Sequence, residues 1–451
     1  MGHRWVRLGS NPRPRIWIPV DCGGRVVRGQ RGGGLTVRAL RLACLSFLLS
    51  AILLSACDSR QTRGPAVQRF DSAGVEIVLG PDVSQVTALG TVVLPPVLSL
   101  GSELDGPELF GSVSFAHLTE DGRLWIADAQ AQELRVFEFP SGAHLMTLGG
   151  PGEGPGEYRA IRPLGFDGAG RPYVYDDRLR RLTIYSPEGQ IEDQRRILPS
   201  EEFSPRPFHV DPSGRLMGQI PRPRIGQVTD GQLLQDTVRI WSIDPEDSET
   251  ALVARVEGPL FYFREFQSVP VPFRFGGRFA LHGDRVYFTN PSGEASYLVF
   301  GSEGLERRVG IDRIQERVSD SALGAYFRYL EALGWPREML KIYDTHLDEM
   351  PVPILKPTWD YPLVADNGDV WLSRIPAEGA DQVLWDVFDS AGEMVGVVAT
   401  PANLVVYQIS GDHLVGVSKD EFDRESVVVL RVECSEWHAD KLCRWPQRLE
   451  I

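Results

Sequence analysis

The sequence predicts an all-β fold, a six-bladed β-propeller with a small helical insertion, preceded by a signal peptide and a flexible tether. Three observations predict it. A passage that begins Leu-Gly and closes on an aromatic residue occurs twice, over 100–110 and 148–158. A tight-turn pattern built on glycine recurs six times, and a short strand of alternating apolar residues follows each turn. Repetition at a spacing of roughly 40 to 50 residues is typical of a radial array of small sheets.

The six turns lie where a hairpin would join the first two strands of each unit. Asn, Asp and Gly suit such turns because a tight hairpin needs positive φ. A third strand follows each hairpin and a fourth precedes the next unit, so we expect six units of four strands. The turns are Asp121–Arg123, Ala169–Arg171, Ser213–Arg215, Gly283–Arg285, Asn367–Asp369 and Gly411–His413.

The segment 91–100 resembles a fourth strand that has no hairpin in front of it. The last unit ends near Val432 and lacks a fourth strand of its own. We therefore expect a strand within 91–100 to pair beside 427–432, which would close the ring and leave no long sheet edge open.

Two gaps between successive turns contain extra residues. The first includes a Pro-rich loop at 221–226, and the second reads as helical over about 312–350. Ser319 is suited to cap the first helix and Gly334 to stop it, while Pro336 can open a second. The helices must bury an apolar stripe, either as plain packing on a face of the propeller or as a lid over its channel. The stripe residues are Leu323, Tyr326, Phe327, Leu330 and Leu333, followed by Met339, Leu340 and Tyr343.

The N-terminal region is expected to direct export. Residues 1–56 form an extension and a signal peptide, in which basic residues precede the apolar run 42–56. Residues 57–70 then form a tether, and the propeller occupies 71–451. The sequence ending in Cys57 resembles the lipobox of bacterial lipoproteins. That resemblance implies acylation of Cys57 and a membrane anchor in the bacterial cell envelope, periplasmic or on the outer surface. The alternative is an ordinary signal peptide followed by a cysteine.

The charge distribution argues against nucleic acid as a partner. The whole chain carries a formal charge of -14, and residues 1–56 contain nine Arg and one Asp, or +8. Residues 57–451 therefore carry -22, and a body this acidic repels phosphate backbones. The sequence predicts no cofactor and a monomer.

Three stretches carry a family resemblance. Residues 122–137, 149–158 and 170–189 resemble NHL-type repeats. The chain is more similar still to bacterial lipoproteins described as six-bladed β-propellers, which often carry Asp-Ser-Ala-Gly-Val after the tether, here 71–75. The resemblance implies the fold and a cell-envelope location. It implies no agreed activity, so it assigns no catalytic residue.

Two histidines are weak candidates for a metal site. His117 and His209 lie at the same strand position, five residues before the turn glycine, and Gly165 occupies that position in the blade between them. Equivalent residues of two blades could converge on the axis. A zinc site needs three protein ligands, and no third histidine aligns, so two structural imidazoles are the competing interpretation. Asp128 and Asp176 also align, and we interpret them as turn caps rather than as an acid–base pair.

The remaining cysteines of the body suggest a disulfide. Cys434 and Cys443 follow the last predicted strand, and in an oxidising compartment they would close a small loop.

The sequence favours a binding function over catalysis. We expect a lipid-anchored module that binds a protein, a peptide or a glycan, because no catalytic constellation is evident. The alternative is a metal-assisted hydrolase or lyase with its site at the channel mouth. A third reading makes the propeller a spacer in a sensory or secretion system.

Overall fold

The computed structural model describes residues 67–82, 89–101, 106–197, 205–219, 229–265, 267–332, 335–377, 379–420, 422 and 424–433. The signal peptide, Cys57, the loop 221–226 and the pair Cys434 and Cys443 lie outside this part of the chain. No helix in the described part is long and apolar enough to span a bilayer.

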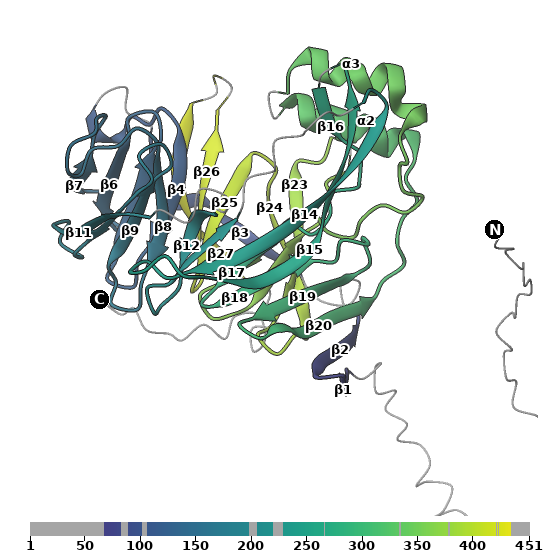
Figure 1. Ribbon diagram of the computed structural model, residues 1–451, viewed down its shortest axis with the longest axis horizontal. Coiled ribbons are helices and arrows are strands. Elements are labelled where there is room, and N and C mark those ends of the chain that lie inside the picture. Colours follow the sequence, from purple (N-terminus) through teal and green to yellow (C-terminus); the bar gives the residue numbers. More distant parts are fainter. Residues whose placement is uncertain are drawn as a thin grey trace, which may run out of the picture. The chain divides into compact units, whose positions relative to one another are not determined.

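The chain folds as a β-propeller, as the sequence predicts (Figure 1). Its described strands form six antiparallel four-stranded units, here called blades 1 to 6. Blade 1 contains β4 (Val113–Leu118), β5 (Arg123–Asp128), β6 (Glu133–Glu138) and β7 (His144–Gly149), and blade 2 contains β8 (Ile161–Phe166), β9 (Pro172–Asp176), β10 (Arg181–Tyr185) and β11 (Ile191–Arg196). Blade 3 contains β12 (Arg206–Val210), β13 (Leu216–Gln219), β14 (Gln232–Ile243) and β15 (Thr250–Arg264), and blade 4 contains β17 (Phe279–His282), β18 (Arg285–Thr289), β19 (Ser296–Gly301) and β20 (Gly304–Asp312). Blade 5 contains β21 (Pro362–Val364), β22 (Val370–Ser373), β23 (Gln382–Phe388) and β24 (Met394–Pro401), and blade 6 contains β25 (Leu404–Ser410), β26 (His413–Lys419), β27 (Glu425–Glu433) and β3 (Leu89–Leu100).

The hairpin turns between the first and second strands adopt the backbone that the sequence predicts. The turn glycine has a positive φ in all six blades, between 56° and 87°. A residue with a Cβ adopts that conformation only with strain. These six glycines therefore fix where each inner strand ends, and hence which side chains reach the end of the channel. The glycines are Gly122, Gly170, Gly214, Gly283, Gly368 and Gly411.

The inner strands contact one another in blade order and close a ring. β4 contacts β8, β8 contacts β12, β17 contacts β21, β21 contacts β25, and β25 returns to β4. The link from blade 3 to blade 4 includes Phe208 and Phe279, whose ring centroids lie 5.4 Å apart. Side chains at the inner strands of different blades therefore meet around one axis.

The last blade is completed by the segment that the sequence singles out. β3 pairs antiparallel with β27, from Leu100 opposite Val427 to Thr91 opposite Glu433. This pairing confirms the expected closure. The start of β3 also pairs in parallel with β24, so blades 5 and 6 share one eight-stranded sheet.

A hairpin precedes this closing strand. β1 (Gln68–Ser72) and β2 (Val75–Pro81) pair with each other, and β2 pairs in parallel with β20 of blade 4. The first described strand thus begins at Gln68, before the expected start of the body at 71. The segment 68–100 thus pairs with the outermost strands of blades 4 and 5 and itself supplies the outermost strand of blade 6.

The core lies between neighbouring blades, because strands in a sheet present side chains to both faces. Between blades 1 and 2, for example, Trp125 and Val136 pack with Tyr158, Ile161 and Val174. Similar clusters lie at the other junctions. The short apolar alternations in the sequence, which predict the strands, therefore correspond to side chains that point alternately toward the two neighbouring blades.

Blade 3 differs from the sequence expectation. The long spacing between the third and fourth turns arises largely because β14 and β15 are extended and run well beyond β13 (Figure 1). A short strand, β16 (Gln267–Pro270), continues the extension. Sequence reasoning missed it because the added residues contain a continuous apolar run, 260–263, and no turn pattern that would mark a further strand.

The second insertion is helical, which confirms that prediction. α2 (Asp320–Ala332) begins after Ser319, whose Oγ accepts a hydrogen bond from the Ala322 backbone N–H at 3.2 Å. α3 (Arg337–His346) begins after Pro336. The apolar stripe packs on the blade 3 extension, so the two insertions of the sequence form one structural unit. Its buried residues are Leu260, Tyr262, Val269, Val271, Phe273, Tyr326, Leu330, Ile342, Tyr343 and Met350.

Tyr343 offers a measure of how firmly this unit is held. Its side chain is 1% exposed, and its hydroxyl donates a hydrogen bond to the Pro270 carbonyl at 2.6 Å. We expect Tyr343→Phe to lower the free energy of unfolding by about 1 kcal/mol, because it leaves a buried carbonyl without its donor. Urea unfolding monitored by fluorescence measures the change. Tyr361→Phe, at a tyrosine that is 46% exposed, should change it by less than about 0.5 kcal/mol.

Candidate functional site

The strongest candidate site lies where the inner strands end, next to the hairpin turns. Five polar side chains from five blades meet there, and we call them the axial ring. They are His117 of β4, His209 of β12, His282 at the end of β17, Asp366 just after β21 and Gln408 of β25. Blade 2 contributes Gly165 of β8 at this level, which has no side chain to fill the space between His117 and His209.

Gln408 fastens the ring to the neighbouring blades. Its side chain is buried, accepts a hydrogen bond from the Leu118 backbone N–H at 2.7 Å and donates to the Leu118 carbonyl at 3.1 Å. The same amide nitrogen lies 3.1 Å from Asp366 Oδ2 and 3.5 Å from His117 Nε2. One amide therefore fixes the positions of a carboxylate from blade 5 and an imidazole from blade 1.

The His117 imidazole lies between the Gln408 amide and two phenylalanine rings. Its ring centroid lies 4.9 Å from that of Phe166 and 5.9 Å from that of Phe115. The imidazole is half-buried but densely surrounded by protein. Burial, and in addition the nearby His209, lowers the pKa of His117 to about 4. The side chain is therefore neutral at physiological pH.

The other two imidazoles are neutral for the same physical reason. Burial lowers the pKa of His209 to about 4, although a hydrogen bond between its Nε2 and the Gly283 carbonyl, 3.3 Å apart, opposes the shift. Burial also lowers the pKa of His282, against the opposing effect of Asp366. The ring thus has three uncharged imidazoles at neutral pH, each of which offers one hydrogen-bond donor and one acceptor.

Asp366 is the anionic member of the ring. It is exposed at the rim, yet its protein surroundings raise the pKa of its carboxyl group, chiefly by desolvation. The nearby charge of Glu120, in the blade 1 turn, acts in the same direction. The rim therefore contains two carboxyl groups, of Asp366 and Glu120, and Asp366 has no Lys or Arg ion-pair partner among the described residues.

The sequence anticipates part of this site. His117 and His209 lie close enough for one to lower the pKa of the other. His282 escapes the alignment because it directly precedes its turn glycine instead of standing five residues before it. In the part of the chain that the structure describes, no three His, Cys, Asp or Glu side chains are arranged to hold a metal ion.

The aligned aspartates have the structural role that the sequence suggests. Asp128 is buried and accepts hydrogen bonds from the backbone N–H groups of Gly111, Ser112, Gln130 and Ala131. Asp176 receives four equivalent bonds in blade 2. Carboxylates that accept several backbone hydrogen bonds order the turns around them, so we interpret both as turn caps.

The lowered pKa values predict how stability depends on pH. In the unfolded chain His117 and His209 titrate near 6.5, whereas in the folded protein they titrate at about 4. The unfolded state therefore binds more protons between these values, and stability falls as the pH drops from about 6.5 to about 4. Urea unfolding at pH 7.5 and 4.5 should show a smaller loss in a variant with both His117→Gln and His209→Gln than in the wild type. Equal losses would contradict the assignment.

Comparison with known proteins assigns the chain to no family. No protein-family model matches the chain, and no curated protein does. Similar solved structures include a Bacteroides fragilis protein provisionally assigned as exported, with 13% identity and a TM-score of 0.46 over 80% of this chain and 100% of that chain. Virginiamycin B lyase from Staphylococcus aureus has 11% identity and a TM-score of 0.37 over 74% and 97% of the two chains. A protein provisionally assigned as a gluconolactonase has 13% identity and a TM-score of 0.38 over 78% and 97%. At these identities no activity transfers to this chain.

Proposed function

We propose that this protein is a monomeric binding module of the bacterial cell envelope, exported and then anchored through a lipid on Cys57. Its propeller binds a protein, peptide or glycan ligand at the axial ring. The observation that carries the proposal is the meeting of three neutral imidazoles, a carboxylate and an amide, each from a different blade, at one end of the inner strands.

The chemistry of the ring suits recognition. Neutral imidazoles can donate and accept hydrogen bonds without imposing a charge on the ligand. The partly exposed rings of Phe115 and Phe166 add an apolar surface beside His117. A small number of fixed polar groups next to aromatic rings is the usual composition of a ligand site.

The rival function is a metal-assisted hydrolase or lyase at the same channel mouth. It would require ligands in coordination geometry, and the described residues do not present such a set. Metal-assisted catalysis at this place would therefore require the described side chains to rearrange.

Arrays of glycans and peptides can test the proposal, with the purified full-length protein as the probe. We expect a set of array positions to be bound by the wild type and by His144→Ala, which alters an exposed histidine of β7, but to be lost in His209→Ala. If His209→Ala still binds the same array positions, the ligand site lies elsewhere on the protein. Stoichiometric zinc, together with turnover that His209→Ala abolishes, would favour the metal-dependent enzyme.

A further inference from the structure

We propose that the ligand group recognised by the axial ring is a cation, either a protonated amine or a guanidinium, carried by a peptide. This inference rests on the proposed binding function and adds the chemical class of the group that is bound. The observation that supports this inference is that one side of the ring is anionic and the other side is uncharged and aromatic.

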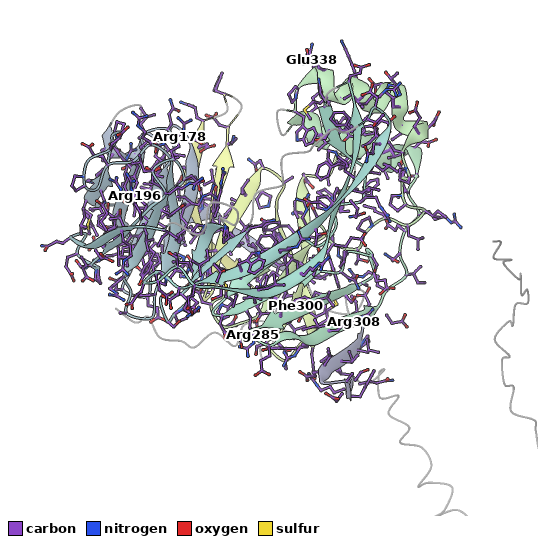
Figure 2. The ribbon with its side chains drawn as sticks, in the orientation of Figure 1. Arg178, Arg196, Arg285, Phe300, Arg308 and Glu338 are labelled. Atoms are coloured by element: carbon purple, nitrogen blue, oxygen red, sulfur yellow. The ribbon has the colours of Figure 1, made fainter. Side chains whose placement is uncertain are left out.

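One side of the ring is anionic and lacks a cationic partner. The carboxylate of Asp366 accepts a hydrogen bond from the neutral amide of Gln408, but no Lys or Arg among the described residues forms an ion pair with it. Glu120 adds a second negative charge nearby. Arg285, which follows the blade 4 turn and is labelled in Figure 2, lies close enough to His282 to lower the pKa of that imidazole. Arg285 Nε lies 2.9 Å from Glu306 Oε2, so its charge is already paired.

The other side of the ring is uncharged and aromatic. His117 stacks on Phe115, with an angle of 16° between the ring planes, and also contacts Phe166. An aromatic face attracts a cation, and the attraction increases where water is excluded. The imidazoles of His117, His209 and His282 are neutral near pH 7, so they do not repel a positive group.

The two sides lie next to each other, because the side-chain nitrogen of Gln408 is 3.1 Å from Asp366 Oδ2 and 3.5 Å from His117 Nε2. Asp366 follows the inner strand of blade 5, whereas Phe115 and Phe166 belong to blades 1 and 2, so the ring closes between them. A cation that enters can approach the carboxylate on one side and the aromatic rings on the other. An anion entering there would instead meet Asp366 and Glu120, with no unpaired Lys or Arg of the ring to receive it.

The test measures affinity for two blocked tripeptides by titration calorimetry with the purified full-length protein at pH 7.5. One is acetyl-glycyl-lysyl-glycinamide, and the other carries an acetyl group on the lysine amine. We expect acetylation to weaken binding at least about tenfold. Asp366→Asn should weaken binding of the lysine peptide by a similar factor, whereas Asp348→Asn, at an exposed aspartate of the helical insertion, should leave it unchanged. Titration with cadaverine, a simple diamine, shows whether the site binds a free amine as well as it binds an amine carried by a peptide.

The outcomes distinguish this inference from the proposed function. Equal binding of both peptides, lost in His209→Ala, would overturn the cationic preference and leave the binding function intact. If cadaverine binds at least as tightly as the lysine peptide, the peptide source is wrong. If Asp366→Asn binds the lysine peptide as tightly as the wild type, the assigned anionic partner is wrong. If neither peptide binds, the inference is wrong. The array experiment would then still decide whether the ring binds another class of ligand.

Discussion

Replacing Leu100 with Asp will lower the free energy of unfolding by about 4 kcal/mol or more. Leu100 ends the strand that completes blade 6, is 2% exposed and packs among Val427, Val415 and Phe137. A carboxylate there must either lose its hydration inside an apolar cluster or pull β3 away from β27. The first alternative costs the hydration energy of the carboxylate, and the second opens the ring at the point where its two ends are joined. Urea unfolding of the purified protein measures the loss.

The same strand supplies the control. Leu94 lies within β3 but is 67% exposed, so Leu94→Asp should change the free energy of unfolding by less than about 0.5 kcal/mol. If both variants are equally stable, β3 is not the outer strand of blade 6. If both variants lose the same free energy of unfolding, the loss comes from placing Asp in the strand and not from the burial of Leu100.

The second large effect is expected at Asp386, the centre of a buried ionic cluster. Its side chain is 0% exposed and accepts hydrogen bonds from Trp359 Nε1 at 2.6 Å and from Arg374 Nη2 at 2.6 Å. It also accepts bonds from Arg313, which in turn contacts Asp82 at 2.6 Å. Burial tends to lower the pKa of Arg313, but its hydrogen bonds to Asp82 and Asp386 give a net increase. Two carboxylates, Asp82 and Asp386, thus balance the charges of two arginines, and Asp386 contacts both of them.

We expect Asp386→Ala to cost about 3 to 5 kcal/mol of unfolding free energy, because it leaves two arginines facing a cavity and an indole N–H without an acceptor. Asp386→Asn keeps the shape but not the charge, so its loss should be smaller. Asp348→Ala, at an exposed site, serves as the reference, with a change below about 0.5 kcal/mol. A loss below about 1 kcal/mol for Asp386→Ala, measured by the same urea titration, would show that the cluster is not intact in solution.

The repeat pattern was sufficient to predict most of the fold. Turn glycines such as Gly122 mark where a blade begins, because few other residues adopt positive φ without strain. The closing strand could be predicted because 91–100 has an outer-strand pattern and the last blade lacks one. The extension of blade 3 could not be predicted, because the continuous apolar run 260–263 cannot be assigned to a strand or a helix by its periodicity.

The candidate site was predictable only in part, for a geometric reason. His117 and His209 share a position relative to their turns, so counting finds them. His282 belongs to an inner strand of four residues, and Asp366 and Gln408 reach the axis from a turn and beside a bulge. Their convergence depends on how each inner strand ends, which a count from the turn does not capture.

Titration of the His117 imidazole by NMR, in the wild type and in His209→Gln, tests most directly whether the inner strands converge. Two imidazoles, from blades 1 and 3, lie close together in desolvated surroundings. We therefore expect His117 to titrate at about 4 and its pKa to rise when His209 is removed, because His209 contributes to lowering it. A His117 that titrates near 6.5 in both proteins would contradict the convergence of the inner strands on which the proposed site depends.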